Sequence, residues 1–156
     1  MNYRKIEIKD DSTNKELELL LVKIAKWHNL TPKLWKSNYR VSSLDIEKTV
    51  QRIKSTKSEE LFLMIAEDEY DQIQGFIWSY KQEKPQDSVM ILSLYVTEGY
   101  RGKGIATNLK VLLEKWCGDE GIKTIHTTVH YNNHNMIGLN QKLGYRPGMV
   151  NMTKNL

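Results

Sequence analysis

The fold of this chain is most evident in residues 94–107, which are Leu94-Tyr95-Val96-Thr97-Glu98-Gly99-Tyr100-Arg101-Gly102-Lys103-Gly104-Ile105-Ala106-Thr107. The segment from Val89 to Val96 that leads into the glycines is apolar on both faces, which predicts a central strand covered by helices. A helix follows, with an apolar face formed by Leu109, Leu112, Leu113 and Trp116. A strand, a glycine-rich turn and a helix N-terminus place backbone N–H groups and the positive end of a helix dipole together, which suits a phosphate.

Two common phosphate-binding motifs do not fit this loop. A Walker A loop continues from Gly-Lys to Ser or Thr, whereas Gly102-Lys103 is followed by Gly104. A dinucleotide-binding Gly-x-Gly-x-x-Gly motif beginning at Gly102 requires a glycine at the position of Thr107. The pattern that remains is Arg-x-x-Gly-x-Ala, formed by Arg101, Gly104 and Ala106.

The hydrophobic pattern around this loop predicts the other elements. In chain order we expect a short strand at Ile6 and Ile8, a helix from about residue 14 to before Pro32, a helix containing Ile46, Val50 and Ile53 after a Ser42-Ser43 cap, a hairpin of residues 61–66 and 76–80, the strand and helix described above, a strand over 125–129, a helix over 133–143, and an extended strand-like tail over 145–151. Thr13 and Glu16 have the spacing of a capping box for the first helix. A right-handed crossover makes the strands at 89–96 and 125–129 parallel.

These elements predict a single domain over residues 1–156, of the α/β (α+β) class, with a mixed sheet and helices on both faces. Its 40% hydrophobic and 27% charged residues are near the globular average and argue against disorder. No segment approaches the roughly 18 apolar residues of a membrane span, and the N-terminus lacks a signal-peptide pattern. Cys117 is the only cysteine, so we expect no internal disulfide and a cytoplasmic location.

Charge and histidine spacing limit the ligands. A net charge of +4 weakly favours anionic ligands, but no run of like charges marks a nucleic-acid arm, so we expect neither nucleic acid nor membrane as a partner. His126 and His130 share a face of the predicted strand about 13 Å apart, too far to hold one metal ion. We therefore predict no metal.

The loop and a second segment together resemble the GNAT N-acetyltransferase superfamily. Its acetyl-CoA loop has the form Gln/Arg-x-x-Gly-x-Gly/Ala, which Arg101, Gly104 and Ala106 match. The second segment, Asn133-His134-Asn135-Met136-Ile137-Gly138-Leu139-Asn140-Gln141-Lys142-Leu143-Gly144-Tyr145, is similar to the family segment that opens with Asn and closes on Gly-Phe or Gly-Tyr. The resemblance covers essentially the whole chain and implies a mostly antiparallel sheet whose parallel fourth and fifth strands splay to bind coenzyme A.

The resemblance implies a set of cofactor contacts, with acetyl-CoA as the acetyl donor. The pyrophosphate would be held by the backbone amides of Arg101, Gly102, Lys103, Gly104, Ile105 and Ala106, with Thr107 capping the site. The pantetheine arm would pair with the backbone of Leu94, Tyr95 and Val96, like an added strand. Asn133 matches the family asparagine that contacts the cofactor arm, and it can also cap the following helix.

The chemistry that the resemblance implies is direct acetyl transfer to an amine of a small molecule, a peptide or a protein. Many members carry a tyrosine that protonates the leaving thiolate at the position of Asn140, where an amide cannot supply a proton. Tyr131 and Tyr145 are substitute donors. A thiol of pKa about 8.5 also leaves tolerably with hydrogen bonding alone. No residue in the sequence stands out as the general base.

Two questions stay open at this stage. The aromatic residues Trp27, Trp35, Tyr39 and Trp78 either contact the acceptor or pack against the sheet. The exchange at Asn140 also leaves an alternative to the enzyme, a regulatory or degenerate GNAT member that binds CoA without transferring acetyl. Family members often form homodimers, and the sequence identifies no interface.

Overall fold

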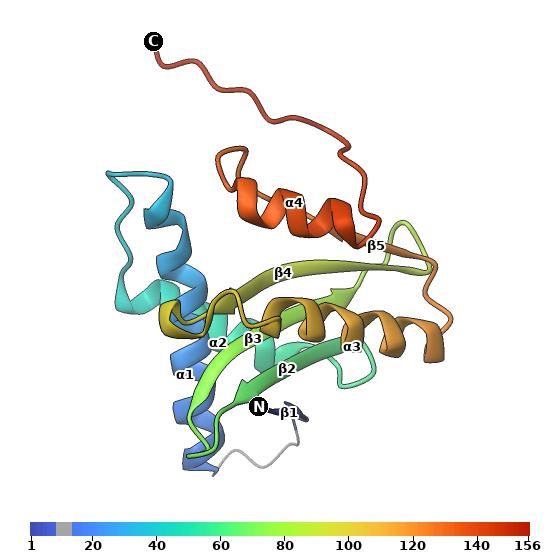
Figure 1. The fold of residues 1–156 in the computed structure, drawn as a ribbon. Helices are drawn as coiled ribbons and strands as arrows, with labels where there is room; N and C mark the ends of the chain where they lie inside the picture. The colour runs from blue at the N-terminus through green and yellow to red at the C-terminus, as the bar shows by residue number, and fades with distance from the viewer. Residues whose placement is uncertain (9–13) are drawn as a thin grey trace.

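The computed structural model describes residues 1–8 and 14–156, and its centre is a five-stranded sheet with the strand order β1-β2-β3-β4-β5 (Figure 1). The strands are β1 (Asn2–Lys5), β2 (Leu61–Glu67), β3 (Ile73–Lys81), β4 (Ser88–Val96) and β5 (Thr124–Thr127). The helices are α1 (Lys15–Leu30), α2 (Ser43–Ser55), α3 (Ile105–Asp119) and α4 (His134–Lys142), with short 3-10 turns at Thr31–Leu34 and Glu98–Tyr100.

The sheet is mixed, as expected. Strands β1 to β4 pair antiparallel with their neighbours, and β4 pairs parallel with β5. The parallel pair follows from α3, which crosses over from the end of β4 to the start of β5. The predicted fold class is therefore confirmed.

Two apolar cores cover the two faces of the sheet, because successive side chains of a strand point to opposite sides. Leu63, Ile65 and Trp78 pack with residues of α1 and α2. Phe62 and Met64 point the other way and pack with residues of α3. The helices α1 and α2 thus lie on one face and α3 on the other (Figure 1).

The predicted helix starts agree with the caps. Ser42 and Asp45 form a capping box at α2, and the Asn14 side chain accepts the Leu17 amide at α1. The predicted capping residue Thr13 lies outside the described residues. Among the helices that the structure describes, none is long and apolar enough to cross a lipid bilayer.

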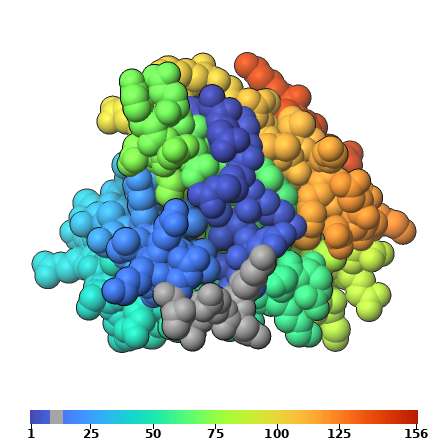
Figure 2. All heavy atoms as spheres, turned by 90° about the horizontal axis from the view of Figure 1, so that it is seen from below, coloured from blue at the N-terminus to red at the C-terminus, as the bar shows by residue number. Residues whose placement is uncertain are grey.

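The two ends of the chain differ from the sequence prediction. The first strand is Asn2–Lys5, which ends just before the expected strand residues Ile6 and Ile8. The Ile6 amide still donates to the Leu63 carbonyl oxygen. This strand lies across the surface beside α1 (Figure 2). The predicted strand over 145–151 is wrong: these residues are in no strand. Pro147 lacks an amide for a ladder, and β5 is too short to offer a partner there.

Candidate active site

A cleft opens where β4 and β5 separate. Their pairing stops at Ile91 and Thr127, whereas β4 continues to Val96 paired with β3 alone. At this point Leu92 is an extra residue on β4, since Ser93 opposes Trp78 and Ile91 opposes Ser79. A β-bulge of this kind bends the strand and leaves backbone groups unpaired. The resulting cleft has a volume of about 360 Å³ and is lined by residues of α1, β4, α3 and α4 and by residues that follow β5.

The glycine-rich loop lies between the end of β4 and the start of α3. Gly102 and Gly104 have φ angles of 75° and 79°, a conformation that side chains with a Cβ disfavour, and there is open space around both. Gly104 is the N-cap of α3 and supplies no side-chain oxygen. The first N–H groups of α3 are therefore without a side-chain cap, which leaves them able to bind an anion.

Neighbouring side chains hold this loop in place. The Arg101 Nε donates to the Val96 carbonyl oxygen at 2.9 Å, which folds the guanidinium back over the end of β4. The Tyr100 hydroxyl donates to Asp68 at 3.1 Å, and the Lys103 ammonium lies 4.7 Å from the centre of the Tyr100 ring. Because Arg101 and Lys103 are exposed, both can add positive charge at the rim of the loop.

Aromatic residues form part of the lining of the cleft. Trp35 stacks on His130 with ring centres 4.9 Å apart, and both line the cleft. His28 also lines it and packs edge-on against Trp78 at 5.1 Å. Burial and the nearby Arg52 guanidinium lower the pKa of His28, so this imidazole is neutral at pH 7. In the sequence His28 belongs with Trp27, Trp35 and Tyr39 to the aromatic residues that either line a substrate pocket or pack against the sheet.

Of the four predicted acceptor-contacting aromatics, the structure brings Trp35 alone to the lining of the cleft. Trp78 is 1% exposed and belongs to the core beneath His28. Trp27 stacks on Tyr95 of β4 at 4.9 Å, so it supports the strand from the α1 side. Tyr39 is half-buried and is not part of the lining of the cleft within the described residues.

The three predicted proton donors lie in different surroundings. Tyr131 is 70% exposed, while Asn140 is 6% exposed at the last turn of α4, inward-facing as its helical position predicts. The Tyr145 hydroxyl is buried with no hydrogen-bond partner among the described residues. None of the three is part of the lining of the cleft in the part of the chain described.

Lys110 of α3 is a cleft residue that sequence reasoning missed. It lines the cleft, is 1% exposed, and its Nζ has no hydrogen-bond partner among the described residues. The sequence indicates its burial by helical spacing, because Lys110 lies three residues before Leu113 and four after Ala106, on the same face of the helix. The buried face of α3 contains Ile105, Leu109, Lys110, Leu113 and Cys117, whereas Leu112 and Trp116 are only half-buried.

Asn133 and His130 complete the lining near α4. The Asn133 Oδ1 accepts the Met136 amide at 3.2 Å and so caps α4, which leaves its Nδ2 free to donate into the cleft. His130 lies beyond β5, which ends at Thr127, so the expectation that His126 and His130 share one strand is wrong. The pairing of β5 with β4 ends at Thr127, and residues 128–130 are in no strand.

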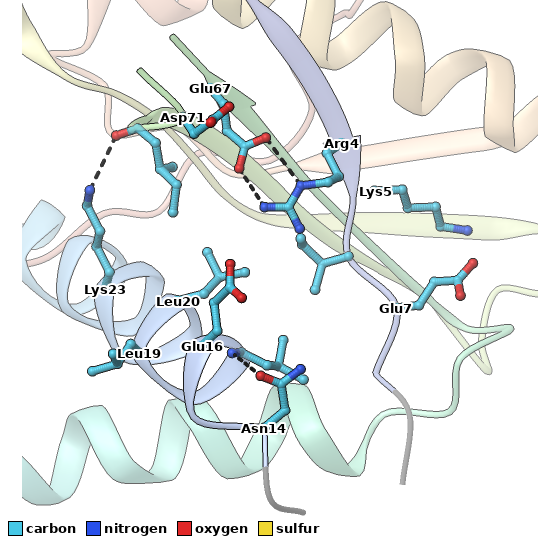
Figure 3. A pocket seen from close by; sticks show the side chains of 13 residues that line it. Arg4, Lys5, Glu7, Asn14, Glu16, Leu19, Leu20, Lys23, Glu67 and Asp71 are labelled. Atoms are coloured by element: carbon cyan, nitrogen blue, oxygen red, sulfur yellow. Dashed lines mark hydrogen bonds and ion pairs between the residues drawn. The ribbon is translucent and has the colours of Figure 1, made fainter. Parts of the chain in front are cut away.

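A second hollow, of about 380 Å³, lies between β1, the start of α1 and the turn between β2 and β3 (Figure 3). Part of its polar lining is paired within itself: Arg4 donates to Glu67 at 2.5 and 3.2 Å, and Lys23 donates to the Ile73 carbonyl oxygen. Glu67 and Asp71 line this hollow and not the cleft. We therefore place the candidate site in the cleft.

Residues 24–145 match the family model described as the acetyltransferase (GNAT) family. The chain belongs to this family. It is 27% identical over 154 residues to an uncharacterized N-acetyltransferase, YdgE, of Bacillus subtilis, covering 94% of this chain and 96% of that protein. The chain is thus a member of the GNAT acetyltransferase family, and the relative YdgE is itself described as uncharacterized.

Solved structures share the fold of this GNAT protein. A crystal structure of a putative GNAT family acetyltransferase from Staphylococcus aureus is 31% identical, with a TM-score of 0.67, and the match covers 82% of this chain and 100% of that one. The structure of AAC(6')-Iy in complex with a bisubstrate analogue, CoA-S-monomethyl-acetylneamine, is 16% identical with a TM-score of 0.67, covering 99% and 97% of the two chains. At 16% identity, the match to AAC(6')-Iy shows a shared fold and does not show a shared substrate.

Proposed function

We propose that this GNAT protein is an acetyl-CoA-dependent N-acetyltransferase that moves an acetyl group directly from the thioester to an amine of a small molecule, a peptide or a protein. The observation that carries the proposal is the cleft where β4 and β5 separate, which is lined by Leu92, Ser93 and Leu94 of β4 and by aromatic residues. The glycine-rich loop and the uncapped N-terminus of α3 follow directly from the end of β4. Such an arrangement would let the cofactor bind along β4 and the acceptor amine bind against the aromatic residues, so that the amine and the thioester meet in the cleft.

The residues of the glycine-rich loop and of the cleft fit coenzyme A. The open space at Gly102 and Gly104 lets a phosphate reach the amides from Arg101 to Thr107, and the positive end of the helix dipole favours its charge. Beyond Ile91 the edge of β4 no longer pairs with β5, so its backbone at Leu94, Tyr95 and Val96 can pair with the pantetheine amides once Arg101 leaves the Val96 carbonyl oxygen. The Asn133 Nδ2 can donate to the same arm. When bound, acetyl-CoA supplies the activated acetyl group.

The neutral His28 is our candidate for the base. An amine of pKa about 10.4 must lose its proton before it can attack a carbonyl. A neutral imidazole accepts that proton, directly or through one water, and the lowered pKa of His28 keeps it in the neutral form. The backbone at the β4 bulge offers an amide donor to a developing oxyanion.

The lining of the cleft limits the acceptor. Among the described residues that line it there is no aspartate or glutamate, while Lys36 lies at its rim. A polycationic acceptor would find no carboxylate partner there, so we propose an acceptor whose body is neutral or anionic and packs on Trp35. The proposal includes a cytoplasmic location, because one buried cysteine suits a reducing compartment.

The test is a screen of amines with acetyl-CoA that measures release of free thiol, after calorimetry has established cofactor binding. The proposal predicts binding of acetyl-CoA and thiol release with at least one amine of the neutral or anionic class. Binding with an intact thioester for every amine would instead favour the regulatory alternative. No binding of acetyl-CoA would contradict both.

A further inference from the structure

Lys110 is the one charged residue on the buried face of α3, where the other positions are Ile105, Leu109, Leu113 and Cys117. A lysine is rarely this deeply buried without a partner, because its ammonium loses solvation that an apolar core does not replace. Packing alone therefore does not account for a lysine at this position.

The surroundings of the Lys110 ammonium supply attraction but no acceptor. Its Nζ lies 4.3 Å from the centre of the Tyr145 ring, whose face attracts a cation. No hydrogen-bond acceptor reaches the Nζ from the described residues. The side chain lines the cleft together with Leu92, Ser93 and Leu94 of β4, at the bulge. The missing acceptor is thus expected from a molecule in the cleft.

We propose that Lys110 is a catalytic residue that donates its Nζ proton to the sulfur leaving the acetyl thioester. This inference rests on the proposed function. As the bond from the acceptor nitrogen to the acetyl carbon forms, the carbon–sulfur bond breaks and the sulfur keeps its electron pair. The nitrogen releases to water the one proton that it carries in excess of the amide product. The sulfur takes the proton of Lys110 and becomes the free thiol, and the neutral Lys110 amine regains a proton from water.

The proton affinity of Lys110 suits this step. Burial lowers the pKa of Lys110 to about 8, and the Glu114 carboxylate opposes that effect. A thiol has a pKa of about 8.5, so transfer between the two is close to balanced, which is the condition for an effective general acid.

The other titratable groups of the neighbouring elements suit the step less well. Burial raises the pKa of Tyr145 to about 12 and that of Cys117 to about 11, so both hold their protons too firmly. His126 of β5 is not part of the lining of the cleft among the described residues, and Tyr131 is exposed. Asn140, at the position of the family tyrosine, has no proton to give. Lys110 combines a place in the cleft with a pKa near that of a thiol.

The experiment measures the thiol pKa of bound coenzyme A from its ultraviolet thiolate absorbance over a pH titration. It uses the wild type, Lys110→Met, Lys110→Arg and the control Lys115→Met, an exposed position of the same helix. We expect the wild type and the control to lower the bound thiol pKa by about 1, a tenfold preference for thiolate. Lys110→Met should abolish this preference, and Lys110→Arg should keep it because its charge remains.

Turnover separates the charge of Lys110 from its proton. Both Lys110→Met and Lys110→Arg should lower kcat by about 10²-fold with little change in cofactor affinity, since the guanidinium does not release its proton. Equal thiol pKa values in the wild type and Lys110→Met, with CoA bound to both, would overturn the role of Lys110 and leave the proposed function intact. Failure of the wild type to bind CoA would instead refute the proposed function.

Discussion

Replacing Lys110 by methionine should make the free protein more stable. The lysine side chain is 1% exposed and its ammonium has no hydrogen-bond partner among the described residues, so the folded state carries an uncompensated charge. Methionine has a similar length, no charge and a flexible side chain, and it can fill the same space.

The pKa of Lys110 gives the size of the effect. A lowered pKa of about 8 in the folded state, against 10.5 for the ordinary group, corresponds to about 3 kcal/mol of destabilisation wherever the side chain is protonated in both states. This penalty is fully present below pH 8. It is relieved as the pH rises from about 8 to 10.5, because the unfolded chain then binds more protons than the folded one. Since methionine packs imperfectly, we expect a gain of about 1–3 kcal/mol.

The assay is urea unfolding of the wild type, Lys110→Met and the exposed control Lys115→Met, at neutral pH and at pH 10. Lys110→Met should unfold at higher urea than the wild type at neutral pH, with the difference shrinking at pH 10. Lys115→Met should lie within about 0.5 kcal/mol of the wild type at both. A loss of stability in Lys110→Met would refute the reasoning, because it would mean that Nζ has a partner in the folded protein. A gain independent of pH would also refute it, because the buried charge would then not be the cause.

Three further substitutions test other parts of the site. Trp35→Ala should raise the acceptor KM by about tenfold through lost ring contact, with the acetyl-CoA KM little changed; an effect confined to the cofactor would remove Trp35 from the acceptor side. His28→Asn should lower kcat by about 10² while CoA binding is kept, and unchanged kcat would exclude His28 as the base. Gly75→Ala should destabilise by about 1–3 kcal/mol in urea unfolding, because its Cβ would lie 2.9 Å from the Tyr95 carbonyl oxygen, whereas Gly99→Ala meets nothing and serves as the control. Equal stability of these two variants would contradict the close approach of β3 and β4.

Features fixed by local pattern were predictable. The continuous apolar run of β2, the alternation in β3, the helical spacing in α1 and α2, and the Arg101-x-x-Gly104-x-Ala106 loop each depend on residues near one another in the sequence. The crossover rule then gave the parallel pairing of β4 and β5. These elements determine where the loop lies.

Features that depend on tertiary packing were not predictable. Lys110 and His28 become part of the site only because α3 and α1 bring them to the lining of the cleft. The helical spacing of Lys110 indicates a buried position, but it does not indicate which cavity the side chain faces. The wrong prediction of a strand at 145–151 also reflects tertiary structure, because an extended segment forms a strand only where another strand can pair with it.

The most direct test of the loop assignment is calorimetry of acetyl-CoA with the wild type, Gly104→Asp and Gly118→Asp. Gly104 has a φ of 79° at the start of α3, so an aspartate there combines backbone strain with negative charge at the proposed phosphate site. Gly118 adds the same charge at the far end of the helix. We predict binding by the wild type and by Gly118→Asp, and at least tenfold weaker binding by folded Gly104→Asp. Equal affinity of all three proteins would contradict the central claim that residues 101–107 hold the pyrophosphate of coenzyme A.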